Sequence, residues 1–89
     1  MDIEREIALF LVETLKVAPA PEKLDTDVPL VEVYGVDSAG IFELILWLED
    51  RFSFHVSVAE MDLANFATIR SAAAYVRRVR GVAAGEAAR

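Results

Sequence analysis

Apolar side chains recur at helical spacing in three stretches of this chain. The first stretch runs from Asp2 to Lys16, and its inward arc is formed by Ile3, Ile7, Phe10, Leu11 and Thr14. The second runs from Ser38 to Phe52, and its inward stripe is formed by Ile41, Leu44, Ile45, Leu48 and Phe52. The third begins after Thr68, a residue that favours the N-cap, and reaches Arg80, where Gly81 is expected to stop it. Its inward positions are Ile69, Ala72, Ala73 and Val76.

The segments between these helices carry weaker signals. Residues 17–36 hold all three prolines and no helical period, which predicts a long loop. This loop is expected to be anchored by apolar side chains that pack against the core, namely Val28, Leu30, Val31 and Val33. A short helix is expected from Val58 to Leu63, and Phe66 is expected to point inward.

No segment alternates as a β-strand, so the sequence predicts an all-α fold. The expected architecture is a small helical bundle with three main helices, one short helix and a long first loop. Residues 1–80 would form one domain, and residues 81–89, which are rich in alanine and glycine, would form a disordered tail.

Composition and charge narrow the classes of function. The chain has 89 residues and no cysteine, which excludes disulfides and thiolate metal sites. Its net charge of −6 is concentrated between residues 22 and 62, whereas the segment from Arg70 onward is basic. The acidic middle repels nucleic acid and favours basic protein partners. No apolar stretch is long enough to span a bilayer, and the N-terminus does not resemble a signal peptide. We therefore expect a cytoplasmic protein without membrane contact. We also expect it to be a monomer.

Ser38 is the most informative polar residue, because it lies at the N-terminal end of a predicted helix, directly after Asp37 and a turn at Gly35. A catalytic serine needs a base within hydrogen-bond reach. The single histidine, His55, lies beyond the far end of a helix that spans roughly 20 Å, so a Ser–His pair is excluded and we expect no enzyme. A helix N-terminus instead favours a phosphate. The alternative is that Asp37 or Ser38 is an ordinary helix cap.

The paired acids do not form a metal site in this interpretation. Their pairs are Asp25 with Asp27, Glu49 with Asp50, and Glu60 with Asp62. None of these pairs lies in a twelve-residue calcium loop, and we expect all of them to be solvated.

Segment 35–52 resembles the motif of the acyl carrier proteins, the phosphopantetheine-binding carrier family. The residues that carry the likeness are Gly35-Val36-Asp37-Ser38 and the acidic, leucine-rich helix that follows them and ends at Phe52. Further likeness lies in Val56, Phe66-Ala67-Thr68-Ile69 and residues 72–76, so the resemblance extends from about Ile3 to Val79. Two departures stand beside the serine: Ala39 replaces the usual leucine, and Gly40 replaces a residue that is often polar.

The resemblance implies a cofactor, partners and a recognition face. Ser38 would carry 4′-phosphopantetheine, which a phosphopantetheinyl transferase installs from coenzyme A, and the terminal thiol would hold an acyl or aminoacyl group as a thioester. Other partners would be a loading ligase and a downstream synthase or transferase. Partner recognition would fall on Asp37, Ala39, Phe42, Glu43, Leu46, Glu49 and Asp50. On a helical wheel, Phe42 and Leu46 lie one turn apart beside the acids, either as an exposed patch or covered by the first loop.

We interpret the chain as a stand-alone carrier for amino acids or short acyl groups in a specialised pathway. The alternatives are a fatty-acid or polyketide carrier with an unusual site, and a helical adaptor in which Ser38 is only a cap. Trp47 would fill the space that a long acyl chain needs if it turned inward, whereas Ala72 to Ala74 would leave room for such a chain. The sequence does not name the cargo or the pathway.

Overall fold

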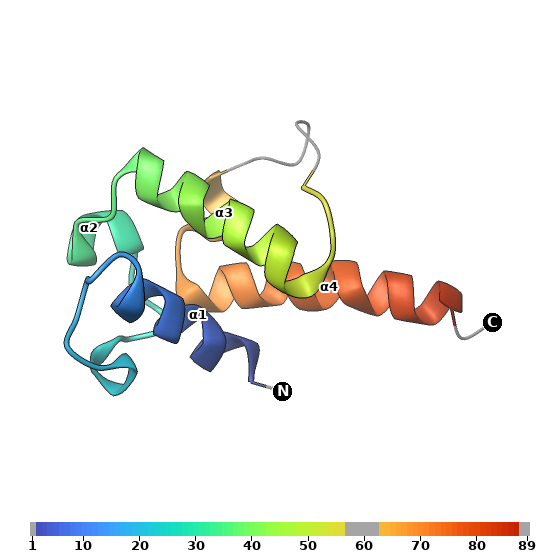
Figure 1. Ribbon diagram of the computed structural model, residues 1–89, viewed down its shortest axis with the longest axis horizontal. Coiled ribbons are helices and arrows are strands. Elements are labelled where there is room, and N and C mark those ends of the chain that lie inside the picture. The colour runs from blue at the N-terminus through green and yellow to red at the C-terminus, as the bar shows by residue number, and fades with distance from the viewer. Residues whose placement is uncertain (1, 57–62, 88–89) are drawn as a thin grey trace.

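The computed structural model describes residues 2–56 and 63–87, with the backbone alone at Leu63 and residues 81–87. Within these residues the chain forms four α-helices (Figure 1): α1 (Ile3–Glu13), α2 (Leu30–Tyr34), α3 (Ser38–Phe52) and α4 (Ile69–Ala87). The same described residues also contain two short 3-10 turns, η1 (Pro21–Lys23) and η3 (Leu63–Phe66). These ranges contain no β-strand, and the expected all-α bundle is confirmed.

Helix α1 is shorter than its sequence pattern predicted. Asp2 caps its start, where the carboxylate accepts a hydrogen bond from the Arg5 amide at 3.2 Å. The helix ends at Glu13 rather than at Lys16 because the backbone turns left-handed at Lys16, with φ of 59°. The amide of the next residue, Val17, then donates to the Leu11 carbonyl at 3.3 Å, which satisfies a carbonyl at the helix end.

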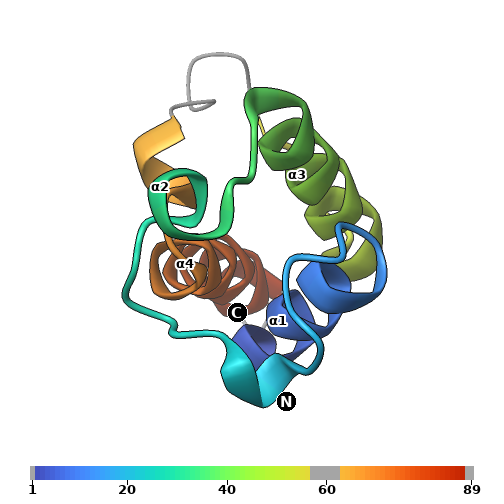
Figure 2. The ribbon, with the colours of Figure 1, turned by 90° about the vertical axis from the view of Figure 1, so that its left-hand side faces the viewer.

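The core lies between α1, α3 and α4, which Figure 2 shows arranged around a common centre. The expected inward positions of α3 and α4 are all buried, and so is Phe66. Trp47 also turns inward, with its ring stacked on Phe10 of α1 at 4.8 Å between centroids and edge-on to Phe52 at 6.1 Å. Thr14, which was expected on the inward arc of α1, is exposed.

The prediction of an unbroken loop over residues 17–36 is wrong, because the segment contains η1 and α2. Gly35 ends α2 in the left-handed conformation, φ 69°, and its amide donates to the carbonyls of Leu30 and Val31. Leu30 is the one fully buried residue of α2 and Tyr34 packs against the core half-buried, whereas Val31 and Val33 remain 52% and 54% exposed. Helical geometry explains this outcome, since Leu30 and Tyr34 lie one turn apart on the same face of α2, whereas Val31 and Val33 lie on other faces.

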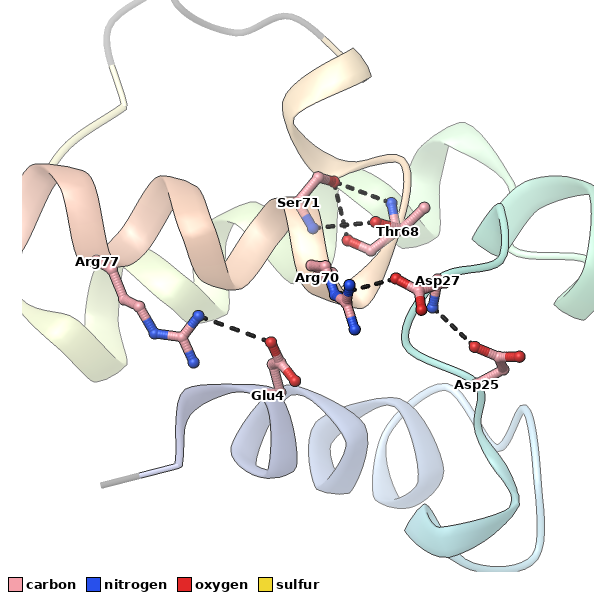
Figure 3. Close-up of polar contacts among 7 residues, drawn as sticks. All are labelled: Glu4, Asp25, Asp27, Thr68, Arg70, Ser71 and Arg77. Carbon is pink, nitrogen blue, oxygen red and sulfur yellow. Dashed lines mark hydrogen bonds and ion pairs between the residues drawn. The ribbon is translucent and has the colours of Figure 1, made fainter.

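The start of α4 is fixed by a reciprocal cap, as expected for Thr68 (Figure 3). The Ser71 amide donates to the Thr68 hydroxyl at 3.0 Å, and the Thr68 amide donates to the Ser71 hydroxyl oxygen at 3.1 Å. Backbone hydrogen bonds also join this region to the first loop: the Leu30 amide donates to the Ala67 carbonyl, and the Arg70 amide to the Thr26 carbonyl.

The end of α4 differs from the prediction. The helix does not stop at Gly81 but continues to Ala87, in a sequence rich in alanine, the best helix former. The domain boundary at residue 80 stays a prediction. The short helix expected from Val58 to Leu63 falls almost entirely on residues 57–62, outside the described residues, and Leu63 instead begins η3.

Ion pairs connect α1 to its neighbours at the surface. Arg51 pairs with Glu6 at 2.6 Å, and Arg77 pairs with Glu4 at 3.6 Å. Figure 3 shows the second of these pairs, which joins α4 to α1. Arg5 pairs with Glu22 of η1 at 3.1 Å, and the pKa of Glu22 is lowered by a backbone hydrogen bond and, next, by this arginine. Such exposed pairs add little stability, so the orientation of the helices depends mainly on the buried apolar contacts.

Candidate functional site around Ser38

Ser38 is the first residue of α3, and the residue before it caps the helix. Asp37 has an extended backbone, and its carboxylate accepts a hydrogen bond from the Gly40 amide at 2.8 Å. Of the two caps that the sequence allowed, the structure uses Asp37. The Ser38 side chain is exposed, and within residues 2–56 and 63–87 its hydroxyl makes no hydrogen bond. This hydroxyl is therefore accessible for modification.

The chain that leads to Ser38 is firmly anchored. The Val36 amide donates to the Leu30 carbonyl at 3.3 Å, and the Val36 side chain is buried at 4% exposure. Gly35 makes the preceding left-handed turn, with nothing within 4 Å of the place that a Cβ would take. The serine thus stands at a fixed point between the end of α2 and the start of α3.

Two hollows of different character flank this point. An apolar pocket of about 470 Å³ is lined by Pro29, Val31, Glu32, Ser38, Ile41, Ala64, Phe66 and Ala67. A more polar hollow of about 360 Å³ is lined by Leu15, Lys16, Val17, Tyr34, Gly35, Val36, Asp37 and Gly40. A group attached to the Ser38 oxygen has an apolar surface directly beside it.

Most residues expected to recognise partners are on the outer face of α3. Ala39, Glu43 and Asp50 are exposed. Phe42 and Leu46 are 49% and 50% exposed, so the first loop does not cover them. Two apolar side chains one turn apart among acids form what we call the α3 patch, consisting of Phe42, Leu46, Glu43 and Asp50.

Glu49 is placed differently from the other acids of α3. Its side chain is only 18% exposed, and its carboxylate oxygen Oε2 accepts a hydrogen bond from the Val56 amide at 2.7 Å. The same oxygen lies 3.1 Å from Nδ1 of His55. Glu49 therefore holds the chain that follows α3, and its negative charge is directed at this segment more than at an approaching partner.

The described residues offer no catalytic or metal centre around Ser38. His55 is beyond the C-terminal end of α3, whereas Ser38 begins it, and fifteen residues of helix span roughly 22 Å. Over the described ranges, no three histidine, cysteine or acidic side chains gather as metal ligands. In the same part of the chain, no helix combines the length and apolar character needed to span a bilayer.

Comparison with known proteins identifies the family. The family model described as the phosphopantetheine attachment site matches residues 5–76. The chain belongs to the acyl carrier protein family. It is 30% identical to an acyl carrier protein of Chlamydia trachomatis over 77 residues, which cover 86% of this chain and 95% of that protein. It is 40% identical to a probable acyl carrier protein, PigG, of Serratia sp. over 57 residues, which cover 64% of this chain and 66% of that protein.

Membership defines the general role of the chain. Acyl carrier proteins are carriers without catalytic activity of their own, and their cofactor is 4′-phosphopantetheine. The site fits this group, because an exposed hydroxyl at a helix start lies near unpaired amide hydrogens and the positive end of the helix dipole. The residues of this chain that would hold the cofactor are Ser38 through its oxygen and the first amides of α3.

The structure adds site residues that the sequence pattern did not reveal. Val31 and Glu32 of α2 line the apolar pocket beside Ser38. Their helix was missed because five residues cannot display a helical period. The glycine at position 35, a common residue just after a helix, was the available signal.

Replacing Glu49 with alanine should lower the free energy of unfolding by about 1–2 kcal/mol, because the Val56 amide loses its acceptor. Glu49→Gln keeps an oxygen acceptor and should lose less. Urea denaturation measures both changes. Asp50→Ala, at an exposed neighbouring position, is the control and should change stability by no more than about 0.5 kcal/mol. Equal losses in Glu49→Ala and Asp50→Ala would contradict the structural role of Glu49.

Proposed function

We propose that this chain carries acyl or aminoacyl groups as thioesters on a phosphopantetheine arm attached to Ser38. The observation that supports this site is the exposed Ser38 hydroxyl, without a hydrogen bond in the described residues, at the start of α3. A phosphopantetheinyl transferase would move the phosphopantetheine group of coenzyme A onto this oxygen. The resulting phosphodiester would be stabilised by the amides and the dipole of the helix N-terminus.

The α3 patch is the surface that we assign to partner docking. Its exposed apolar pair, Phe42 and Leu46, can be desolvated by a partner, and its acids favour a basic surface on that partner. The partner classes are the transferase, a loading ligase, and a downstream synthase or transferase. Transient contact with several enzymes suits a small apolar patch with a charged rim.

For the cargo, we favour a short acyl or an aminoacyl group over a long fatty acyl chain. Trp47 fills the space between α1 and α3 by stacking on Phe10, so a long chain could enter there only by displacing packed rings. The pocket beside Ser38 is lined in part by the side chains of Ile41 and Phe66, which are packed into the core. Glu32, the one carboxylate among the described residues that line this pocket, is suited to face an ammonium group. The stand-alone arrangement and the cytoplasmic location stay predictions.

The attachment site is tested by weighing the intact protein. The wild type, incubated with coenzyme A, magnesium and a promiscuous phosphopantetheinyl transferase, should gain the mass of one phosphopantetheine group. Ser38→Ala should fold normally and gain none, because the acceptor oxygen is gone. Ser71→Ala, which alters a serine of the α4 cap, should still be modified. A Ser38→Ala protein that gains the mass would contradict the assignment, and a wild type that gains none would favour an adaptor without a cofactor.

The docking surface is tested by charge reversal. Glu43→Lys should lower kcat/KM for modification roughly fivefold, because the exposed acid no longer attracts a basic partner, and added salt should shrink the difference. Glu22→Lys makes the same charge change on η1, which Figure 2 shows on the side of α1 away from α3, and should leave the rate unchanged. The assignment fails if neither Glu43→Lys nor salt alters the rate.

The size of the cargo is tested with two loaded forms of the protein. One form carries a two-carbon acyl group on the phosphopantetheine arm, and the other carries a fourteen-carbon acyl group. The melting temperature of the protein should not be higher with the longer group. Entry of the longer chain would have to displace packed side chains at a cost of about 1–3 kcal/mol. Trp47 fluorescence should be equal in the two forms. Clear stabilisation by the longer chain, together with a changed Trp47 signal, would instead indicate that the chain is held inside the bundle.

A further inference from the structure

Gly40 is a buried residue in the first turn of α3, two positions after Ser38. A Cβ atom at this residue would lie 2.9 Å from Cγ1 of Val36, 3.3 Å from Oδ1 of Asp37 and 3.5 Å from Cδ1 of Leu15. The first of these separations is too short for two carbon atoms. The second would crowd the same carboxylate oxygen that accepts the hydrogen bond of the Gly40 amide.

The neighbours of Gly40 have little freedom to move away. Val36 is β-branched and only 4% exposed, so its side chain cannot rotate outward without leaving the core. Its amide is also bonded to the Leu30 carbonyl at the end of α2. Any side chain at position 40 would therefore displace the backbone of residues 36–38 relative to α3. A glycine in the first turn of a helix is unfavourable by itself, and this close approach is the physical reason for its presence here.

We propose that Gly40 is a positioning residue for the modification of Ser38. By allowing Val36 and Asp37 to lie directly against the first turn of α3, it fixes the direction in which the Ser38 oxygen points. The proposal rests on the assignment of Ser38 as the attachment site. It concerns how this chain, with a glycine where a polar residue is common, presents that serine to the transferase.

The reaction depends on this direction. The Ser38 oxygen attacks the phosphorus of coenzyme A that bears the pantetheine, the bond to the adenosine-side phosphate breaks, and the hydroxyl proton passes to a base on the transferase. Attack requires the oxygen to be in line with the leaving group, and small displacements are costly in rate. The side chains of the α3 patch are exposed whereas Gly40 is buried, so a methyl group at position 40 leaves the docking side chains in place and binding of the transferase should change little.

The experiment compares Gly40→Ala, Val36→Ala and the double variant in transferase assays with coenzyme A. Gly40→Ala should lower kcat by about tenfold or more with KM nearly unchanged. Val36→Ala removes the Cγ1 atom that the new methyl group would meet, so the double variant should recover kcat to within about twofold to threefold of Val36→Ala alone. Circular dichroism verifies that each variant is fully folded. If Gly40 only stabilised the fold, Gly40→Ala would lower the folded fraction, but the fully folded protein would keep the kcat of the wild type.

Two results would overturn the proposal. One is a folded Gly40→Ala protein with the kcat of the wild type, and the other is a double variant as slow as Gly40→Ala. If Gly40→Ala does not fold, the double variant must fold and be modified, and its failure also overturns the proposal.

Amide spectra of the unmodified proteins separate this proposal from the attachment site. Resonances of residues 36–41 should shift in Gly40→Ala and return toward those of Val36→Ala in the double variant, whether or not Ser38 is the acceptor. Unchanged amide positions in Gly40→Ala would contradict the close packing. Loss of modification in the wild type would count against the attachment site alone.

Discussion

The hydrogen bond that the Asp37 carboxylate accepts from the Gly40 amide defines where α3 begins, and with it the position of Ser38. The first amides of a helix have no partner within the helix, and a side chain just before the helix can supply one. Here the side chain comes from the residue directly before the serine. The Ser38 hydroxyl is therefore not used as the helix cap and remains accessible. If Ser38 itself capped the helix, its oxygen would be engaged in a hydrogen bond.

The two faces of α3 have different roles, since one packs in the core and the other is exposed to solvent. The inner face buries Leu44, Ile45 and Leu48 among the other helices, and this burial supplies most of the stability that such a small bundle can have. The outer face presents Phe42 and Leu46 to solvent, where their exposure costs stability but is available for contact with other proteins. Because both faces belong to one rigid helix, whatever fixes the core also fixes the geometry between the patch and Ser38.

The long helices could be predicted from the sequence because their burial pattern repeats over several turns. All five inward positions of α3 and all four of α4 are buried as the spacing indicated, and Thr68 caps α4. Helix α2 could not be recognised, since its single turn fully buries only Leu30, leaves Tyr34 half-buried and exposes the three residues between them. The stop expected at Gly81 was wrong because a glycine ends a helix only where the backbone turns left-handed, as at Gly35, and alanines follow Gly81.

The candidate site was predictable in its chemistry but not in its contacts. Asp37 and Ser38 were singled out by their place before an apolar helix, and both stand there in the structure. Glu49 illustrates the limit, because its spacing resembles that of the exposed acids while its carboxylate binds the Val56 amide after the helix has ended. That contact depends on the path of the chain beyond Phe52. A helical wheel describes only residues within the helix and so cannot predict it. The tight approach at Gly40 likewise involves Leu15, a residue from a distant part of the sequence.

The two backbone hydrogen bonds between the first loop and the start of α4 have a consequence for folding. They join residues about forty positions apart, Leu30 with Ala67 and Thr26 with Arg70, in a bundle whose other hydrogen bonds are mostly local. Local helical turns can form early, whereas these bonds must wait until α4 has docked. The segment that leads to Ser38 should therefore reach its final path late in folding, and transient separation of α4 should release it first.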